Sequence, residues 1–242
     1  MGQTFDVAII GGGIAGFSLA HYLGANRKVL ILEQEDAFGY HATARSAAEF
    51  AFRFHTPLVG KLAALSFPFL NNPPQDFSAV QLLRERGMIL IASEEKRARL
   101  DEVLATESAK TDRLRRFSRD EVLAAAPILN PDFFASAFFD PDCWDIEADA
   151  LFQGFRKSAS ANGTVAISKA RVVSAERKSG YWQIDTHSGQ FEAAVVVNAS
   201  GAWADQTAVL FGAAPLAHAP LNRTMITVDI PVGIDWRSMP EV

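Results

Sequence analysis

The feature that most constrains the fold is a glycine-rich turn near the N-terminus, Gly11–Gly16, with the sequence Gly-Gly-Gly-Ile-Ala-Gly. It directly follows the apolar segment Phe5–Ile10, which has the composition of a buried strand. A helical segment, Phe17–Leu23, and a second apolar strand, Lys28–Leu32, come next, and this strand ends at Glu33. The order of strand, GxGxxG turn, helix, strand and acid is typical of a βαβ unit that binds a dinucleotide.

Each part of this turn has a physical role in such a unit. Gly11 permits the tight turn, Gly13 lets a pyrophosphate approach the backbone, and Gly16 allows the helix to pack on the sheet. The helix N-terminus offers free amides and the positive end of its dipole to phosphates. Glu33 can accept hydrogen bonds from both hydroxyls of a ribose, and an acid there disfavours a 2′-phosphate. The alternative is a glycine-rich loop in an ordinary α/β fold.

Composition excludes several other classes of protein. A length of 242 residues predicts one or two domains, and the net charge of −5 disfavours a nucleic-acid partner. The single cysteine, Cys143, excludes an internal disulfide, and the histidines have no ligand spacing, so we expect no metal. No apolar run reaches the roughly 20 residues of a transmembrane segment. No targeting signal is evident, and a cytoplasmic location is expected.

The segment after Glu33 bears on whether the dinucleotide is NAD or FAD. It is a loop rich in small residues, Gly39–Ala48, rather than a further alternation of strands and helices. Thr43 and Ser46 offer hydroxyl groups there, and Arg45 offers a cation. Such a loop suits the extended ribityl and ring portion of FAD, whereas an NAD-dependent dehydrogenase remains the alternative.

These residues resemble those of a known family. The turn, Glu33, the loop and the later segment Asn198–Trp203 (Asn-Ala-Ser-Gly-Ala-Trp) are similar to the glycine/D-amino acid oxidase family of FAD-dependent oxidoreductases. Within it, the loop, Asp145–Leu151 and Pro231–Asp235 most resemble the bacterial D-arginine dehydrogenases. The resemblance implies non-covalent FAD, although His41 lies in the loop where some relatives attach flavin covalently. The expected FAD contacts are Gly11, Gly13, Ile14, Ala15, Gly16, Glu33, Gln34, Thr43, Arg45, Ser46, Ala47, Val172, Ala199, Gly201 and Trp203, of which the roles of Val172 and of the Ala199–Gly201 turn come from the resemblance.

The fold class expected is α/β. A Rossmann-like FAD-binding domain is predicted over residues 1–55 and 141–205, interleaved with a mixed α+β substrate-binding domain over 56–140 and 206–242. The predicted helices are 58–70 (failing near Pro68), 94–104, a short one opened by a capping box at Ser118–Glu121, and 146–162. The later predicted strands are 88–92, 133–139, 164–167, 171–176, a hairpin of 181–186 and 190–197, and 223–230.

For the chemistry, the resemblance implies hydride transfer from an amino acid or amine to flavin N5, with an imino product. An arginine can bind a substrate carboxylate with two hydrogen bonds, and Arg223 is the candidate, with a solvated strand arginine as the alternative. Arg53 is a weaker candidate. The resemblance places Glu49, Ala51, Phe54 and Gly87 at positions where the D-arginine dehydrogenases have other residues in the substrate pocket. These replacements weaken the case for arginine as substrate.

The relatives in this family continue well beyond the position matched by Val242. We therefore expect an N-terminal portion that lacks a C-terminal part of the substrate domain, and that requires the missing segment or a partner chain. Three functions compete: an FAD-dependent oxidoreductase on amino acids or amines, a non-catalytic flavin-binding fragment or subunit, and an NAD-dependent dehydrogenase.

Overall fold

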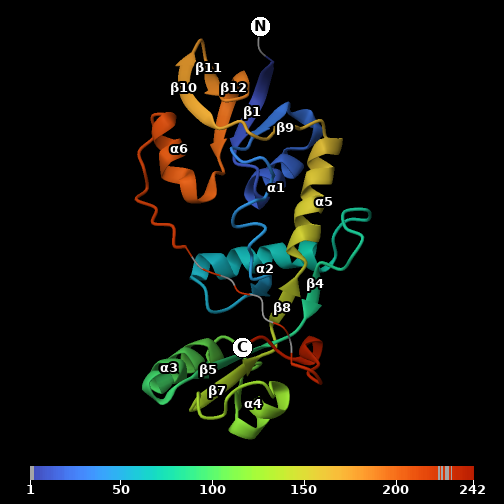
Figure 1. The fold of residues 1–242 in the computed structure, drawn as a ribbon, viewed down its shortest axis with the longest axis vertical. Helices are drawn as coiled ribbons and strands as arrows, with labels where there is room; N and C mark the ends of the chain where they lie inside the picture. Colours follow the sequence, from blue (N-terminus) through green and yellow to red (C-terminus); the bar gives the residue numbers. More distant parts are fainter. Residues whose placement is uncertain (1–2, 223, 225, 227–228, 230) are drawn as a thin grey trace. The chain divides into compact units, whose positions relative to one another are not determined.

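The structure is a computed structural model that describes residues 3–222, 224, 226, 229 and 231–242. The chain divides into two compact units, each assembled from separate stretches of sequence, which Figure 1 traces by colour. Unit 1 consists of Met1–Ala47, Pro74–Val80 and Ala148–Met225, and unit 2 consists of Ala48–Pro73, Gln81–Glu147 and Ile226–Val242.

Unit 1 is built on a six-stranded sheet in the order β10-β11-β12-β1-β2-β9. Strands β12, β1, β2 and β9 run parallel, whereas β10, β11 and β12 form an antiparallel meander. Ile10 lies opposite both Asn198 and Leu32, so the carboxyl ends of three strands meet at one edge of the sheet. The strands are β1 (Thr4–Ile10), β2 (Val29–Leu32), β9 (Val165–Ile167), β10 (Val172–Lys178), β11 (Tyr181–Thr186) and β12 (Gly189–Asn198).

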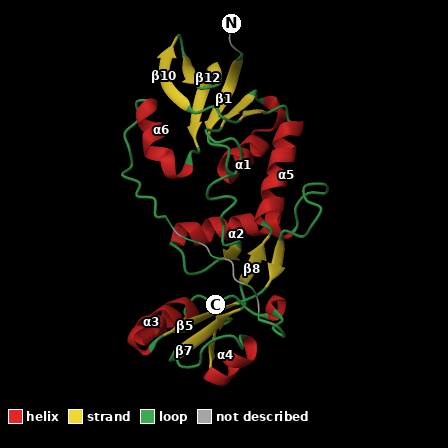
Figure 2. Ribbon diagram, viewed as in Figure 1, coloured by secondary structure: helices red, strands yellow, loops and turns green. Residues whose placement is uncertain are grey.

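Helices cover this sheet on both faces (Figure 2). One face carries Phe5, Ile10, Leu30 and Ile184, with Leu210 and Phe211 at the end of α6 (Ala204–Leu210) packed against them. On the other face α1 (Ile14–Leu23) packs against α5 (Ala148–Ala161), and aromatic rings fill the contact between these two helices. The alternation of side chains along β1 and β2 therefore buries both faces, as expected for parallel strands.

Unit 2 contains two small antiparallel sheets, β3-β8-β4 and β5-β7-β6. Their strands are β3 (Glu49–Ala51), β4 (Leu83–Glu85), β5 (Met88–Ala92), β6 (Arg115–Phe117), β7 (Ser136–Asp140) and β8 (Cys143–Ile146). The helices are α2 (Pro57–Asn71), α3 (Arg97–Ser108) and α4 (Arg119–Ala125). The predicted capping box at α4 is confirmed, because Ser118 Oγ accepts from the Glu121 amide at 3.2 Å and Glu121 Oε2 accepts from the Ser118 amide at 2.8 Å.

Two predictions from the sequence are wrong. Helix α2 runs through Pro68 to Asn71 instead of failing there, because a proline in the last turn removes a single hydrogen bond and its own carbonyl still accepts from the Asn72 amide. The segment predicted as a strand from 133 begins only at Ser136, since residues before it form turns. The predicted strand 223–230 falls largely on residues outside the described part, and it stays a prediction.

In the part of the chain that the structure describes, no helix is long and apolar enough to cross a bilayer.

A buried ion network fastens β7 and β8 of unit 2 to the segment after β3. Arg53 Nη1 donates to both carboxylate oxygens of Asp140, at 2.6 and 2.9 Å, and its Nη2 donates to Asp142 at 2.6 Å. Asp142 also pairs with Arg113 at 3.0 Å. The Asp140 side chain is only 1% exposed, so its charge depends on Arg53 for compensation. Next to this network, burial and nearby carboxylates raise the pKa of the Cys143 thiol to about 12, which favours the protonated thiol at neutral pH.

The glycine turn of unit 1 generates a first prediction. Gly11 has a φ of +115°, and a Cβ atom on it would lie 2.3 Å from the Ala199 carbonyl oxygen. Gly24 also has a positive φ, +65°, but open space around it. We expect Gly24→Ala to lower the free energy of unfolding by about 1–3 kcal/mol from backbone strain alone, and Gly11→Ala to exceed that loss by about 1–3 kcal/mol from overpacking. Denaturant unfolding measures both, and equal losses would contradict the close approach of Ala199 to the turn.

The ion network of unit 2 generates a second prediction. Arg53→Ala leaves the buried Asp140 uncompensated, and the free energy of unfolding should fall by about 3–5 kcal/mol. Arg97→Ala is the matched control, because Arg97 forms an exposed pair with Glu94 at 3.1 Å, for which about 1 kcal/mol or less is expected. Replacing Asp140 by asparagine as well should recover part of the loss. A loss at Arg53 no larger than that at Arg97 would show that the network does not support unit 2.

Candidate cofactor site

The site is centred on the carboxylate of Glu33, directly after β2. Its Oε2 accepts a hydrogen bond from the Gly12 amide at 2.7 Å, and its Oε1 accepts from the Glu35 amide at 2.9 Å. Glu33 is only 9% exposed. Each carboxylate oxygen can accept two hydrogen bonds, so each keeps one lone pair for a ligand. Two acceptors on one carboxylate match the two neighbouring hydroxyls of a ribose.

The N-terminus of α1 forms the next part of the site. Its N-cap, Gly13, has no side chain of its own to satisfy the first amides of the helix, and the Thr43 hydroxyl accepts from the Ile14 amide at 3.0 Å instead. A Cβ on Gly13 would lie 3.3 Å from this hydroxyl oxygen, and one on Gly16 would lie 2.1 Å from the Gly11 carbonyl oxygen. A side chain at Gly16 would therefore collide with the backbone of the glycine turn. The amides at Ala15 and Gly16 belong to the first turn, where the helix itself provides no acceptor.

The loop that begins at Gly39 lies against this turn. The Gly39 amide donates to the Gly12 carbonyl at 2.9 Å, and the Ala44 amide closes the loop on the Gly39 carbonyl at 2.9 Å. The guanidinium of Arg45 lies over the Tyr40 ring, 4.7 Å from its centroid. A cavity of about 270 Å³ is lined here by Phe38, Gly39, Thr43, Ala44, Ser46, Ala148, Asp149, Phe152 and Gln153.

Two further segments complete the edge of the sheet. The Ala199 amide donates to the Ile10 carbonyl at 2.8 Å, which holds the turn after β12 beside the glycine turn. Trp203, two residues after Gly201, has its ring 4.5 Å from that of His41. The segment before Val172 bonds to the chain at Glu33, because the Ala170 amide donates to the Glu33 carbonyl at 2.7 Å. The structure thus brings segments 11–16, 33–35, 39–46, 169–172 and 198–203 to one edge.

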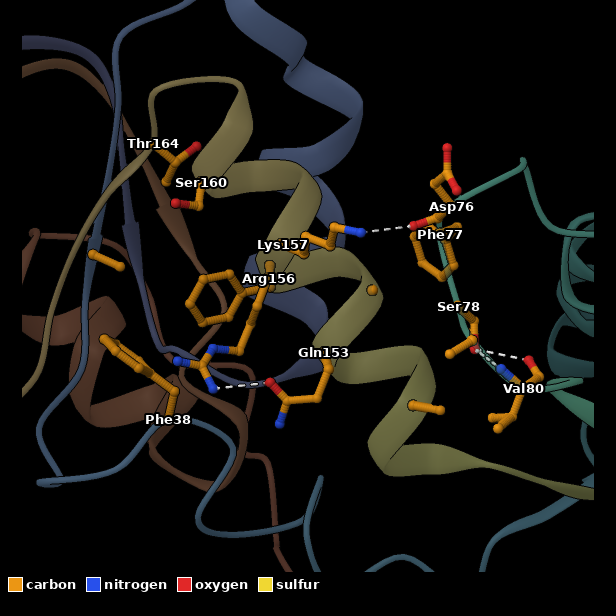
Figure 3. A pocket seen from close by; sticks show the side chains of 15 residues that line it. Phe38, Asp76, Phe77, Ser78, Val80, Gln153, Arg156, Lys157, Ser160 and Thr164 are labelled. Atoms are coloured by element: carbon orange, nitrogen blue, oxygen red, sulfur yellow. Dashed lines mark hydrogen bonds between the residues drawn. The ribbon is translucent and has the colours of Figure 1, made fainter.

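A larger cavity of about 830 Å³ in unit 1 runs along α5 (Figure 3). It is lined in part by Phe38, by Arg156, which donates to Gln153 at 3.1 Å, and by Lys157, which donates to the Asp76 carbonyl at 3.1 Å. None of the predicted cofactor contacts lines it. We therefore do not assign this cavity as the cofactor site, although it is larger than the cavity beside the Gly39 loop.

The structure shows the surroundings of several predicted substrate residues in unit 2. Arg53 is already paired with two buried aspartates, so it is not free to bind a substrate carboxylate. Glu49 lies in strand β3 opposite Asp145. Gly87 has a φ of +72°, and a Cβ there would lie 2.5 Å from the Phe139 ring, so this position favours glycine. Arg223 lies outside the described residues.

Several contacts of the site have no signal in the sequence. The Phe38 and Phe152 rings each pack edge-on against Phe17 at the base of the loop, at 5.3 and 5.5 Å between centroids. His41 pairs with Glu35 at 2.9 Å. These contacts join residues far apart in the chain or within an irregular loop, where neither periodicity nor a motif predicts a partner. No group of three or more potential metal ligands occurs among the described residues.

Known proteins resemble this chain over most of its length. Glycine oxidase from Geobacillus kaustophilus (strain HTA426) is 26% identical over 243 residues, which cover 96% of this chain and 63% of the relative. FAD-dependent oxidoreductase domain-containing protein 1 from Bos taurus is 27% identical, over 94% of this chain and 53% of the relative. The chain therefore spans between half and two thirds of the length of these two relatives.

Solved structures show the same fold. The crystal structure of glycine oxidase from Geobacillus kaustophilus has a TM-score of 0.77 at 26% identity, covering 87% of this chain and 59% of that one. L-alpha-glycerophosphate oxidase from Mycoplasma pneumoniae with FAD bound has a TM-score of 0.75 at 19% identity, covering 86% and 57%, and shows the fold alone. These matches confirm the predicted α/β fold class.

The family model described as DAO, FAD dependent oxidoreductase, matches residues 6–240. This match covers nearly the whole chain and decides between the two dinucleotides that the glycine turn left open, because it identifies FAD rather than NAD as the cofactor. The chain belongs to the FAD dependent oxidoreductase (DAO) family.

Proposed function

We propose that the chain is part of an FAD-dependent oxidoreductase that oxidises the C–N bond of an amino acid or amine. The observation that carries this proposal is the convergence of Glu33, the N-terminus of α1 and the Gly39 loop at one sheet edge. The similarity to glycine oxidase over 96% of the chain supports an amino acid as substrate. We assign FAD binding to unit 1 and part of a substrate-binding domain to unit 2. The closer likeness to D-arginine dehydrogenases and the cytoplasmic location stay predictions.

The residues of unit 1 fit the parts of FAD in order. Glu33 would accept from the ribose hydroxyls, with Gln34 and the backbone at Val172 near the adenine. The pyrophosphate would meet the amides of Ala15 and Gly16, and beside them the Thr43 hydroxyl, which accepts from the Ile14 amide, can still donate its proton. The remaining predicted contacts would bind the flavin side of FAD: Arg45, Ser46 and Ala47 of the loop, and Ala199, Gly201 and Trp203 in or next to the turn after β12.

FAD, when bound, would supply the redox chemistry as a hydride acceptor. The chain has to hold the substrate with its α C–H bond toward the flavin and exclude water from it. A neutral amine needs no side-chain base for this step: loss of the hydride from its α carbon leaves an iminium cation, which then releases a proton to give the imine. Because Arg53 is engaged by Asp140 and Asp142, Arg223 is our candidate for the substrate carboxylate.

We also propose that a further segment or a partner chain completes unit 1. Strand β11 pairs with β12 only as far as Ala193, whereas β1 pairs with β12 up to Asn198. Among the described residues, the outer edge of Ala194–Asn198 therefore has no neighbouring strand, and Val195 is 52% exposed there. An unpaired edge rich in β-branched residues suits the addition of a strand.

The test is anaerobic reduction of the FAD-loaded chain with a panel of glycine, N-methylated glycines, D-amino acids and L-amino acids. We expect loss of the visible flavin absorbance with at least one of them, and none with the matched 2-hydroxy acids, because these lack the C–N bond. Reduction by hydroxy acids alone would contradict the proposed substrate class. A stably bound flavin that no compound reduces would instead indicate a non-catalytic flavin-binding unit. Stoichiometric FAD in the purified 242-residue chain would refute the need for a further segment in cofactor binding.

A further inference from the structure

His41 connects three segments of the cofactor site. It belongs to the loop Gly39–Ser46, and its Nε2 lies 2.9 Å from Oε1 of Glu35, two residues after Glu33. Its ring lies 4.5 Å from the Trp203 ring between centroids, at a tilt of 53°. One side chain therefore touches the segment after β2 and the segment after β12 while it belongs to the loop between them.

This arrangement adds to anchors that the loop already has on α1. Thr43 accepts from the Ile14 amide, and the Gly39 amide donates to the Gly12 carbonyl. These bonds fix the loop to the glycine turn, whereas His41 fixes it to Glu35 and Trp203. The His41 and Glu35 side chains are 36% and 33% exposed, and a polar contact of that exposure contributes little to global stability. The contact therefore acts on the position of the loop more than on the stability of the sheet.

The proposed FAD contacts lie on both sides of this connection. Thr43, Arg45 and Ser46 are in the loop, whereas Ala199 and Trp203 are in or next to the turn after β12. A ligand that touches both segments binds fully only when the loop is closed on the turn. The affinity measured for such a ligand is the intrinsic affinity multiplied by the fraction of the chain in which the loop is closed.

We propose that His41 is a positioning residue that latches the Gly39–Ser46 loop to Glu35 and Trp203, and that this latch sets the affinity of the chain for FAD. The inference rests on the FAD site proposed above. It assigns His41 a non-covalent role: its imidazole holds the closed loop through Glu35 and the Trp203 ring. Opening of this latch admits FAD, and its closure retains FAD.

The first experiment measures the dissociation constant of FAD by quenching of flavin fluorescence. His41→Ala should raise it about three- to tenfold, as expected for the loss of one partly exposed hydrogen bond and one aromatic contact. His187→Ala is the matched control, because His187 is an exposed histidine at the β11–β12 turn, and it should leave the constant unchanged. Equal constants for the two variants would overturn the proposal.

A double-mutant cycle separates a latch from two independent effects. Glu35→Ala should weaken FAD binding by no more than His41→Ala does, because the ring contact to Trp203 remains. The double variant should match His41→Ala, since both changes open the same latch. If the fold-changes in the FAD dissociation constant of the two single variants multiply in the double variant, the pairing of His41 with Glu35 is overturned.

Amide hydrogen exchange tests the latch without FAD. The Ala44 amide, which donates to the Gly39 carbonyl, should exchange about three- to tenfold faster in His41→Ala, whereas the amides of β1 should not change. Unchanged exchange at Ala44 would overturn the latch. If the unaltered chain binds no FAD, as the proposed need for a further segment predicts, this exchange measurement still decides whether His41 holds the loop.

Discussion

The two amide hydrogen bonds to the buried carboxylate of Glu33 organise the cofactor edge of unit 1. A buried carboxylate is costly unless it is hydrogen-bonded, and Gly12 and Glu35 supply the two donors. The Gly12 bond ties the glycine turn to the end of β2, while the Glu35 bond sets the course of the chain toward the loop. The backbone of Glu33 adds a third connection by accepting from Ala170, which places the start of β10 alongside. The cofactor segments thus share one anchor.

Unit 2 depends on a different physical interaction. In unit 2, Arg53 compensates two buried aspartates through an ion network, whereas the sheet of unit 1 is supported by apolar packing. The consequence is that the Arg53 guanidinium is committed to the structure of unit 2 and is not free to bind another carboxylate.

The sequence predicts those parts of the fold in which local rules decide the structure. The βαβ unit is predictable because its apolar strands, its glycines and Glu33 each have a fixed role at a fixed spacing, and the capping box at Ser118 is equally local. Strand β3 and helix α6 escape prediction: β3 has only three residues, and its pairing with β8 joins positions nearly a hundred residues apart. The pairing of Arg53 with Asp140 is not predictable from the sequence for the same reason, since tertiary contacts determine which carboxylate the arginine meets. Helix α2 shows the opposite kind of error: the local rule that a proline ends a helix overestimates the effect of a proline in the last turn.

The central claim is that Glu33 and the N-terminus of α1 bind the adenosine diphosphate part of FAD. The most direct measurement is a calorimetric titration of the chain with ADP and with ADP that carries a 2′-phosphate. ADP should bind and compete with FAD, and the 2′-phosphate should weaken binding about tenfold or more, because it places a second negative group against the Glu33 carboxylate. Equal affinity for the two nucleotides would contradict the account.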